Sequence, residues 1–129
     1  MKRLFIPMLL VLFALATACQ ESMEKRAERD AQNLMKKCPM PIGTDGNVIL
    51  ESVSFDIPTL TWHEVLLLDY GGVELDDTEV RNMLAKELKN TPSYKPYRDN
   101  GYRFQYVYLR MSDPKDTLIN VMLTKADYE

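Results

Sequence analysis

The first nineteen residues constrain this chain more than any other stretch, because they decide which part of it folds. Lys2 and Arg3 form a positive start, residues 4–16 are almost all apolar, and small residues lead up to Cys19. A charged start, an apolar middle and small residues at a cleavage site are the layout of a bacterial export signal. The apolar run is too short for a transmembrane helix, which needs about 20 such residues. We therefore expect residues 1–18 to be a signal peptide, with the remainder acting in the cell envelope.

The small residues before Cys19 allow two cleavage sites. The stretch resembles the lipobox of bacterial lipoproteins, in which the cysteine is lipidated and becomes the mature N-terminus. A lipobox usually has leucine three residues before the cysteine, where this chain has Ala16. Ordinary signal cleavage after Ala18 therefore also fits the small residues.

The spacing of the two cysteines favours lipidation. If Cys19 were not lipidated, its obvious partner in an oxidising compartment would be Cys38. The residues between them have a helical pattern, and a helix of about 15 residues would be about 22 Å long. A disulfide needs Cα atoms within about 7 Å of each other. We therefore expect lipidation of Cys19, with residues 19–30 as a tether between the membrane and the domain.

Length and charge limit the class of protein. About 110 residues remain after the signal, which suits one domain that buries a core without disulfides. The full chain has a net charge of −3, and loss of Lys2 and Arg3 with the signal makes it −5. An acidic chain lacks the basic surface that nucleic acids need, so we predict no nucleic-acid partner. It also lacks a polybasic patch for anionic lipids, so membrane attachment would rest on the acyl chains.

The first half of the remaining chain predicts a helix and a hairpin. Residues 20–37 carry an apolar stripe at helical spacing behind Ser22, which can cap the helix. Two prolines within residues 38–41 end this helix. Residues 47–55 and 60–69 are rich in β-branched and apolar residues and predict two antiparallel strands.

Glu64 interrupts the pattern of the second strand. Trp62, Leu66 and Leu68 lie on the same strand face at alternate positions. A carboxylate on an apolar face costs free energy unless it meets solvent or a partner. We therefore expect Glu64 to lie near an opening or to pair with another group.

The second half repeats this order. Asp76 predicts the N-cap of a helix, which residues 90–92 end. Residues 93–99 have the composition of a loop. Residues 102–111 and 117–124 alternate in polarity and predict the second hairpin.

These elements predict an α+β domain over residues 31–129 in the order αββαββ. The expected architecture is a four-stranded antiparallel sheet with two helices on one face. Similar turn residues open the second strand of each hairpin, as at residues 58–60 and 116–118. A duplicated αββ unit would explain this likeness, and independent use of common turn-forming residues is the alternative.

Two further short motifs accompany the lipobox-like start. Lys-Cys-Pro follows the first helix at residues 37–39, and Gly-Tyr-Arg-Phe-Gln-Tyr-Val-Tyr spans residues 101–108. With these motifs the chain resembles small exported bacterial proteins of unassigned function, some of them lipoproteins of the Bacteroides type. The resemblance implies a lipid-anchored protein of the cell envelope, facing the periplasm or the cell surface. It transfers no catalytic residue to this chain.

No set of residues predicts catalysis. His63 is the only histidine, whereas a catalytic triad or a zinc site needs several converging groups. Cys38 and His63 could form a thiol–imidazole dyad. A histidine on a sheet face and a half-buried structural cysteine explain the same residues more simply. We therefore predict a non-enzyme without cofactor or metal.

The richest recognition chemistry in the chain is its set of tyrosines and arginines. Both residue types are favoured at protein interfaces. The alternative is that the aromatic rings pack under the helices as core. The candidate binding residues are Tyr94, Tyr97, Arg98, Tyr102 and Trp62.

The function that these observations favour is a non-catalytic interaction module that binds an unidentified envelope protein or peptide. An immunity-type inhibitor of an envelope toxin is one specific form. The alternative from another class is a carrier of a small molecule or glycan. A carrier needs a cavity in which Trp62 stacks on the ligand, so a closed core around Trp62 would count against it.

Overall fold

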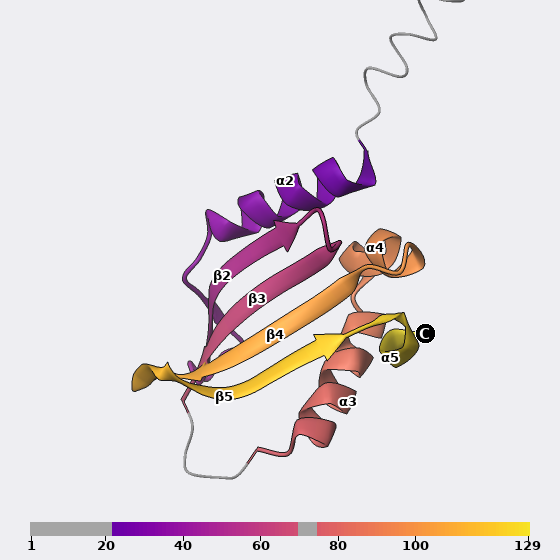
Figure 1. Ribbon diagram of the computed structural model, residues 1–129. Coiled ribbons are helices and arrows are strands. Elements are labelled where there is room, and N and C mark those ends of the chain that lie inside the picture. Colours follow the sequence, from indigo (N-terminus) through magenta and orange to yellow (C-terminus); the bar gives the residue numbers. More distant parts are fainter. Residues whose placement is uncertain (1–21, 70–74) are drawn as a thin grey trace, which may run out of the picture.

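The computed structural model describes residues 22–69 and 75–129. The predicted signal peptide and Cys19 lie outside the described residues. The centre of the domain is a five-stranded sheet in the order β1-β2-β3-β4-β5. In Figure 1, α3 passes behind the sheet, whose other broad face is turned toward the viewer. No helix within the two described ranges has the length and apolar character to cross a membrane.

The first helix, α2 (Met23–Met35), confirms the helix expected near the start of the domain. Ser22 caps it, because its hydroxyl accepts a hydrogen bond from the backbone N–H of Lys25 at 3.3 Å. Ala27 and Ala31 are its buried positions, and their small side chains let the helix approach its neighbours closely. Because Ala27 is fully buried, any flexible tether ends before this residue.

Helix α2 lies along one edge of the sheet (Figure 1). Strand β1 (Met40–Ile42) is short and pairs antiparallel with only the first part of β2 (Val48–Asp56). Beyond β1, the backbone N–H of Val53 in β2 donates a hydrogen bond to the sulfur of Met35 at 3.5 Å. The helix thus covers a strand edge that would otherwise be open to pairing with another chain.

Both predicted hairpins are confirmed. Strand β2 pairs antiparallel with β3 (Thr61–Leu68). Strand β4 (Arg103–Arg110) pairs antiparallel with β5 (Asp113–Leu123), which begins earlier than the sequence pattern indicates.

The prediction of a four-stranded antiparallel sheet is wrong in two respects. Strand β1 adds a fifth strand, and β3 pairs parallel with β4, with Thr61 opposite Arg103 and Leu68 opposite Arg110. The chain between β3 and β4 contains α3 (Asp77–Lys89), which brings it back to the end of the sheet where β3 began. A helix that connects two neighbouring strands is the usual parallel crossover. The domain is therefore α+β with a mixed sheet.

The strand directions do not fit a simple αββ repeat. Strand β2 is antiparallel to β3, and β3 is parallel to β4, so β2 and β4 run in opposite directions. A copy made by translation along the sheet would give the first strands of both units the same direction. The two halves therefore share the order of a helix followed by a hairpin along the chain, but they do not share the same arrangement in the sheet.

Short helices fill positions that the sequence pattern does not identify. The predicted loop at residues 93–99 is instead the 3-10 helix η1 (Pro92–Tyr94) followed by α4 (Lys95–Asp99). Helix α5 (Lys125–Tyr128) ends the chain and contacts α3. Helices this short carry too few apolar positions to show a helical period.

The core lies between the sheet and the helices. Alternate residues of the central strands face inward, and the parallel register places Trp62 beside Phe104. Each large apolar side chain buried here contributes about 1.5–3 kcal/mol. The largest fully buried side chains are those of Trp62, Tyr97, Phe104, Leu123, Val121 and Thr61.

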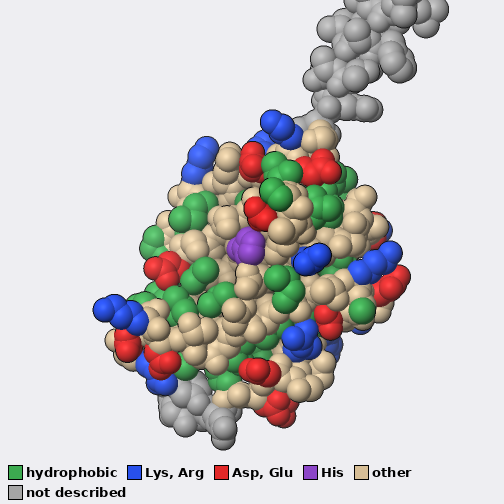
Figure 2. All heavy atoms as spheres, viewed as in Figure 1, with side chains coloured by type: hydrophobic (Ala, Val, Ile, Leu, Met, Phe, Trp, Pro, Cys, Tyr) green, Lys and Arg blue, Asp and Glu red, His purple; other side chains and the backbone are tan. Residues whose placement is uncertain are grey.

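The opposite face of the sheet, here called the open face, carries half-buried apolar residues such as Ile49, Val65 and Val107. Figure 2 views this face, with the histidine in purple near its centre. The ring nitrogen Nδ1 of His63 is hydrogen-bonded to Oε1 of Gln105 on the neighbouring strand. His63 therefore has a structural partner across the sheet.

Candidate interaction groove

An apolar groove opens between α3 and the helix-covered face of the sheet. Its volume is about 330 Å³. Residues from all five strands and from α3 contribute to its walls. Its apolar lining includes Ile42, Val48, Leu66, Leu68, Val80, Met83 and Ile119. We call this feature the α3 groove.

Two side chains of the α3 groove are unusually exposed. Ile42 is 41% exposed and Met83 is 50% exposed. Single exposed apolar side chains are normal on a protein surface. Here two of them, from β1 and α3, flank a hollow whose other walls are mostly apolar. Such a continuous apolar surface is typical of a place where another molecule binds.

One acidic residue, Glu87 of α3, lines the α3 groove. Glu64 belongs to the same face of β3 as the lining residue Leu66 but does not itself line the groove. The parallel register places Glu64 beside Tyr106. The hydroxyl of Tyr94 donates a hydrogen bond to Oε1 of Glu64 at 3.3 Å. Glu64 therefore has the partner that its place on an apolar face requires, as the sequence predicts.

The environment of Glu64 changes its charge state. Burial raises the pKa of its carboxyl group to about 7, the hydrogen bond from Tyr94 lowers it, and the charge of Glu87 raises it. Burial also raises the pKa of Tyr94 and of Tyr106, and it raises the pKa of Tyr108 to about 12. These hydroxyls are therefore neutral and can donate hydrogen bonds. Within the described residues, the ion pairs involve neither Glu64 nor Glu87.

The structure buries most of the aromatic residues that the sequence suggests for binding. Trp62 is 2% exposed, and Tyr97 and Tyr102 are also buried. The ring centroids of Trp62 and Tyr97 lie 5.2 Å apart, and Tyr97 stacks on Tyr102 at 5.7 Å. The hydroxyl of Tyr97 donates to Asp30 of α2 at 2.6 Å. These three rings thus pack in the core, whereas the half-buried Tyr94 lies above Glu64.

The burial of Trp62 bears on the carrier alternative. A ring that is 2% exposed cannot stack on a ligand unless the surrounding core opens. The carrier hypothesis therefore loses the side chain on which it was built.

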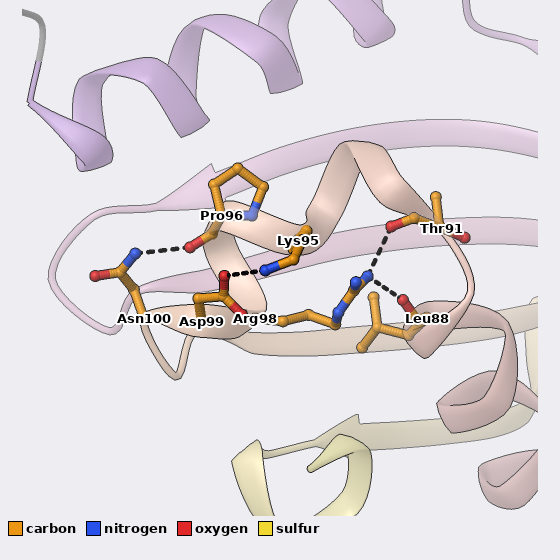
Figure 3. Close-up of polar contacts among 7 residues, drawn as sticks. All are labelled: Leu88, Thr91, Lys95, Pro96, Arg98, Asp99 and Asn100. Carbon is orange, nitrogen blue, oxygen red and sulfur yellow. Dashed lines mark hydrogen bonds and ion pairs between the residues drawn. The ribbon is translucent and has the colours of Figure 1, made fainter.

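Arg98 acts within the fold. Figure 3 shows its guanidinium group beside the end of α3, where Nη1 donates to the backbone carbonyls of Leu88 and Thr91, the latter at 2.6 Å. The last carbonyls of a helix lack intrahelical partners, and a positive charge is favourable there. Arg98 thereby joins α4 to α3.

Cys38 and His63 have separate structural partners. The thiol of Cys38 donates to the backbone carbonyl of Leu34 at 3.4 Å, whereas His63 bonds Gln105. Burial, followed by the charge of Glu64, raises the pKa of the Cys38 thiol, which reduces the reactive thiolate fraction. Among residues 22–69 and 75–129, no group of three or more His, Cys, Asp or Glu is placed to hold a metal ion.

The α3 groove cannot be recognised from the sequence alone. Its walls come from segments that are distant in the chain, such as Ile42 and Met83. The nearest irregularity in the sequence is Glu64, which breaks the apolar face of β3 two residues before the lining residue Leu66. A residue that breaks a local folding rule is often retained for function.

Comparisons with solved structures show the same fold in proteins of bacterial export. The type 2 secretion system pilotin EpsS from Vibrio vulnificus is 14% identical, with a TM-score of 0.65, over 82% of this chain and 91% of that chain. The type II secretion system pilotin AspS from Vibrio cholerae is 12% identical, with a TM-score of 0.62, over 81% of this chain and 90% of that chain.

A provisionally assigned secreted protein from Pseudomonas aeruginosa is 9% identical, with a TM-score of 0.63, over 85% of this chain and 100% of that chain. At these identities the likeness shows the fold alone. No curated protein matches the chain. Residues 22–119 match the model of the family described as Domain of unknown function (DUF8479). The chain therefore belongs to the DUF8479 family.

Proposed function

We propose that this chain is a non-catalytic interaction module of the bacterial cell envelope, and that its α3 groove binds a segment of another envelope protein. The observation that carries the proposal is the exposure of Ile42 and Met83 beside an apolar hollow. Burying such side chains against a partner contributes about 25 cal/mol for each Å² of apolar surface. The shared fold of two type II secretion pilotins supports a role in the envelope.

The proposed location follows from the N-terminal sequence. Lipidation of Cys19 would hold the domain at an envelope membrane. The domain would then face the periplasm or the cell surface and meet its partner there. An immunity-type inhibitor of an envelope toxin is one form of the same proposal, and the identity of the bound protein distinguishes this form.

Photo-crosslinking tests the proposal at the groove itself. The full chain is expressed in its own host with p-benzoylphenylalanine at position 83 and irradiated in intact cells. We expect a covalent adduct with another envelope protein. The matched control carries the same amino acid at position 35, because Met35 is 44% exposed but lies beside the open face with Cys38 and Val65.

The comparison of the two positions decides the outcome. An adduct at position 83 that position 35 does not form supports binding in the α3 groove. The same adducts at both positions, or none at position 83, would show that this groove is not a docking site.

A further inference from the structure

We propose that the outer face of α2 lies against the envelope membrane, where Lys25, Arg29 and Lys36 contact anionic lipid headgroups. The inference rests on the proposed lipidation of Cys19 and goes beyond it, because it assigns the side of the domain that meets the bilayer. These three basic residues are here called the α2 stripe.

The α2 stripe arises from helical spacing. Its members are four and seven residues apart, and the backbone at Lys36 is still helical, so the three side chains lie within about 40° around the helix axis. All three are exposed, on the side of the helix away from the buried Ala27 and Ala31. Lys25 lies in the first turn, where a cation is unfavourable to the helix dipole. Helix stability therefore does not account for this residue.

The acidic residues of α2 do not share this exposure. Glu24, Glu28 and Asp30 are half-buried. Asp30 accepts the hydrogen bond from the hydroxyl of Tyr97. Arg29 approaches Asp30 at 3.7 Å, and its side chain is still 52% exposed, because an exposed pair of this kind is weak. The helix thus leaves its basic side chains on the outer face.

Charge is distributed unevenly along the chain. Residues 22–37 carry five basic and three acidic side chains, whereas residues 38–129 carry nine basic and fifteen acidic ones. An anionic bilayer attracts the first segment and repels the second, which turns α2 toward the membrane. The net negative charge of the whole chain hides this basic surface, because the acids elsewhere outnumber it. Attachment therefore rests on headgroup contacts as well as on the acyl chains.

The proposed lipid anchor would hold α2 close to the bilayer. Cys19 is three residues before Ser22, the N-cap of the helix. Three residues span at most about 11 Å, so the start of α2 would lie within this distance of the lipidated residue. The Debye length at physiological ionic strength is about 8 Å. Charges held this near the headgroups are only partly screened.

This orientation leaves the α3 groove accessible from the aqueous side. In Figure 1, α2 lies along the β2 edge of the sheet, and α3 lies toward the other side of the molecule. Figure 2 shows blue Lys and Arg side chains at the upper rim, where Figure 1 places α2. A partner segment can then reach the groove while α2 rests on the membrane.

Fluorescence quenching measures which side of the domain meets the bilayer. The full chain is expressed with Cys38→Ser, and the mature lipidated protein is reconstituted into vesicles whose headgroups carry a nitroxide quencher. A fluorophore is attached through Gln32→Cys, beside the α2 stripe, or through Asn82→Cys on α3, and both positions are exposed. On vesicles with phosphatidylglycerol we expect stronger quenching at position 32 than at position 82. On vesicles of phosphatidylcholine alone this difference should disappear.

Removal of charge tests the α2 stripe itself. The stripe variant is Lys25→Gln, Arg29→Gln and Lys36→Gln. It should abolish the difference between the two positions, because each cation near an anionic surface strengthens the attraction about fivefold. The matched control removes the same charge at exposed positions of α3 and β5, through Lys86→Gln, Lys89→Gln and Lys115→Gln. This control should keep the difference.

The outcomes separate this inference from the proposed function. Equal quenching at positions 32 and 82, a difference that persists on neutral vesicles, or a difference that survives the stripe variant overturns the inference. The crosslink at position 83 tests the α3 groove independently and can succeed when this inference fails. A mature protein without lipid on Cys19 overturns the inference together with the proposed anchor and leaves the groove proposal intact.

Discussion

The surroundings of Glu64 move the pKa of its carboxyl group close to neutral pH. Burial raises this pKa from 4.5 to about 7. The hydrogen bond from Tyr94 lowers the pKa, and the charge of Glu87 raises it further. Tyr106 lies beside it on β4. Near neutral pH, part of the population is therefore protonated at Glu64. The stability of the domain should therefore follow this proton.

The stability of the domain should depend on pH through Glu64. Between pH 4.5 and about 7 the folded state binds this proton and the unfolded state releases it. The Glu64 contribution is therefore fully present below pH 4.5 and is lost as pH rises through about 7. A shift of this size corresponds to about 3 kcal/mol.

Glu64→Gln keeps an oxygen for the hydrogen bond from Tyr94 and removes the charge. Urea unfolding at pH 5 and pH 8 should show that the substitution stabilises the domain mainly at pH 8. Glu51→Gln serves as the exposed control. An equal difference between Glu64→Gln and the natural chain at both pH values would contradict the assignment.

At the scale of elements, α3 has two roles. It carries the chain from β3 back to the start of β4, and it forms one wall of the α3 groove. Both of its ends are secured. Asp76 accepts hydrogen bonds from the backbone N–H groups of Thr78 and Glu79 at 2.8 and 3.4 Å. Arg98 binds carbonyls at the other end, so the groove wall is held in place.

Substitution of Arg98 should loosen this wall. Arg98→Met keeps much of the side-chain stem but removes the charged donor that binds the carbonyls of Leu88 and Thr91, which retain only backbone donors. We expect the free energy of unfolding to fall by about 1–3 kcal/mol, measured by urea denaturation. Arg103→Met, at an exposed position of β4, is the control. If the two variants were equally stable, the contacts of Arg98 would not support α3.

At the scale of the whole molecule, the sheet separates two surfaces with different character. Helices cover one face and leave the α3 groove between α3 and the strands. The open face in Figure 2 carries His63 and half-buried apolar residues. Helix α2 lies at the edge between these faces, directly after the residues proposed to reach the membrane (Figure 1).

The proposed anchor gives a prediction for the whole molecule. Cys19→Ser should move the protein from the membrane fraction to the soluble fraction after cell fractionation. The domain should stay folded, because the Cys38 thiol bonds the carbonyl of Leu34 and is not in a disulfide. Helix α2 would hold its two ends about 20 Å apart, which opposes a bridge across it.

Mass spectrometry of the mature N-terminus supplies the direct measurement. We expect Cys19 to be the first residue and to carry a diacylglycerol. The Cys38→Ser variant is the control and should stay in the membrane fraction. An unmodified Cys19 joined to Cys38 would contradict the proposed anchor.

Features that depend on neighbouring residues were determined by the sequence itself. The caps at Ser22 and Asp76 are bonds between positions two or three residues apart. The two hairpins follow from alternating polarity and short turns. The sequence also predicts that Glu64 needs a partner, because this residue interrupts an apolar strand face.

Features that join distant segments were decided only by the tertiary structure. The parallel pairing of β3 with β4 depends on the path of α3, and the partner of Glu64 proved to be Tyr94, thirty residues away. Tyr97 and Tyr102 are buried, although a tyrosine side chain suits a surface equally well. The physical reason is that burial and long-range hydrogen bonds depend on which surfaces the folded chain brings together. The α3 groove arises in the same way, from residues that meet only after folding.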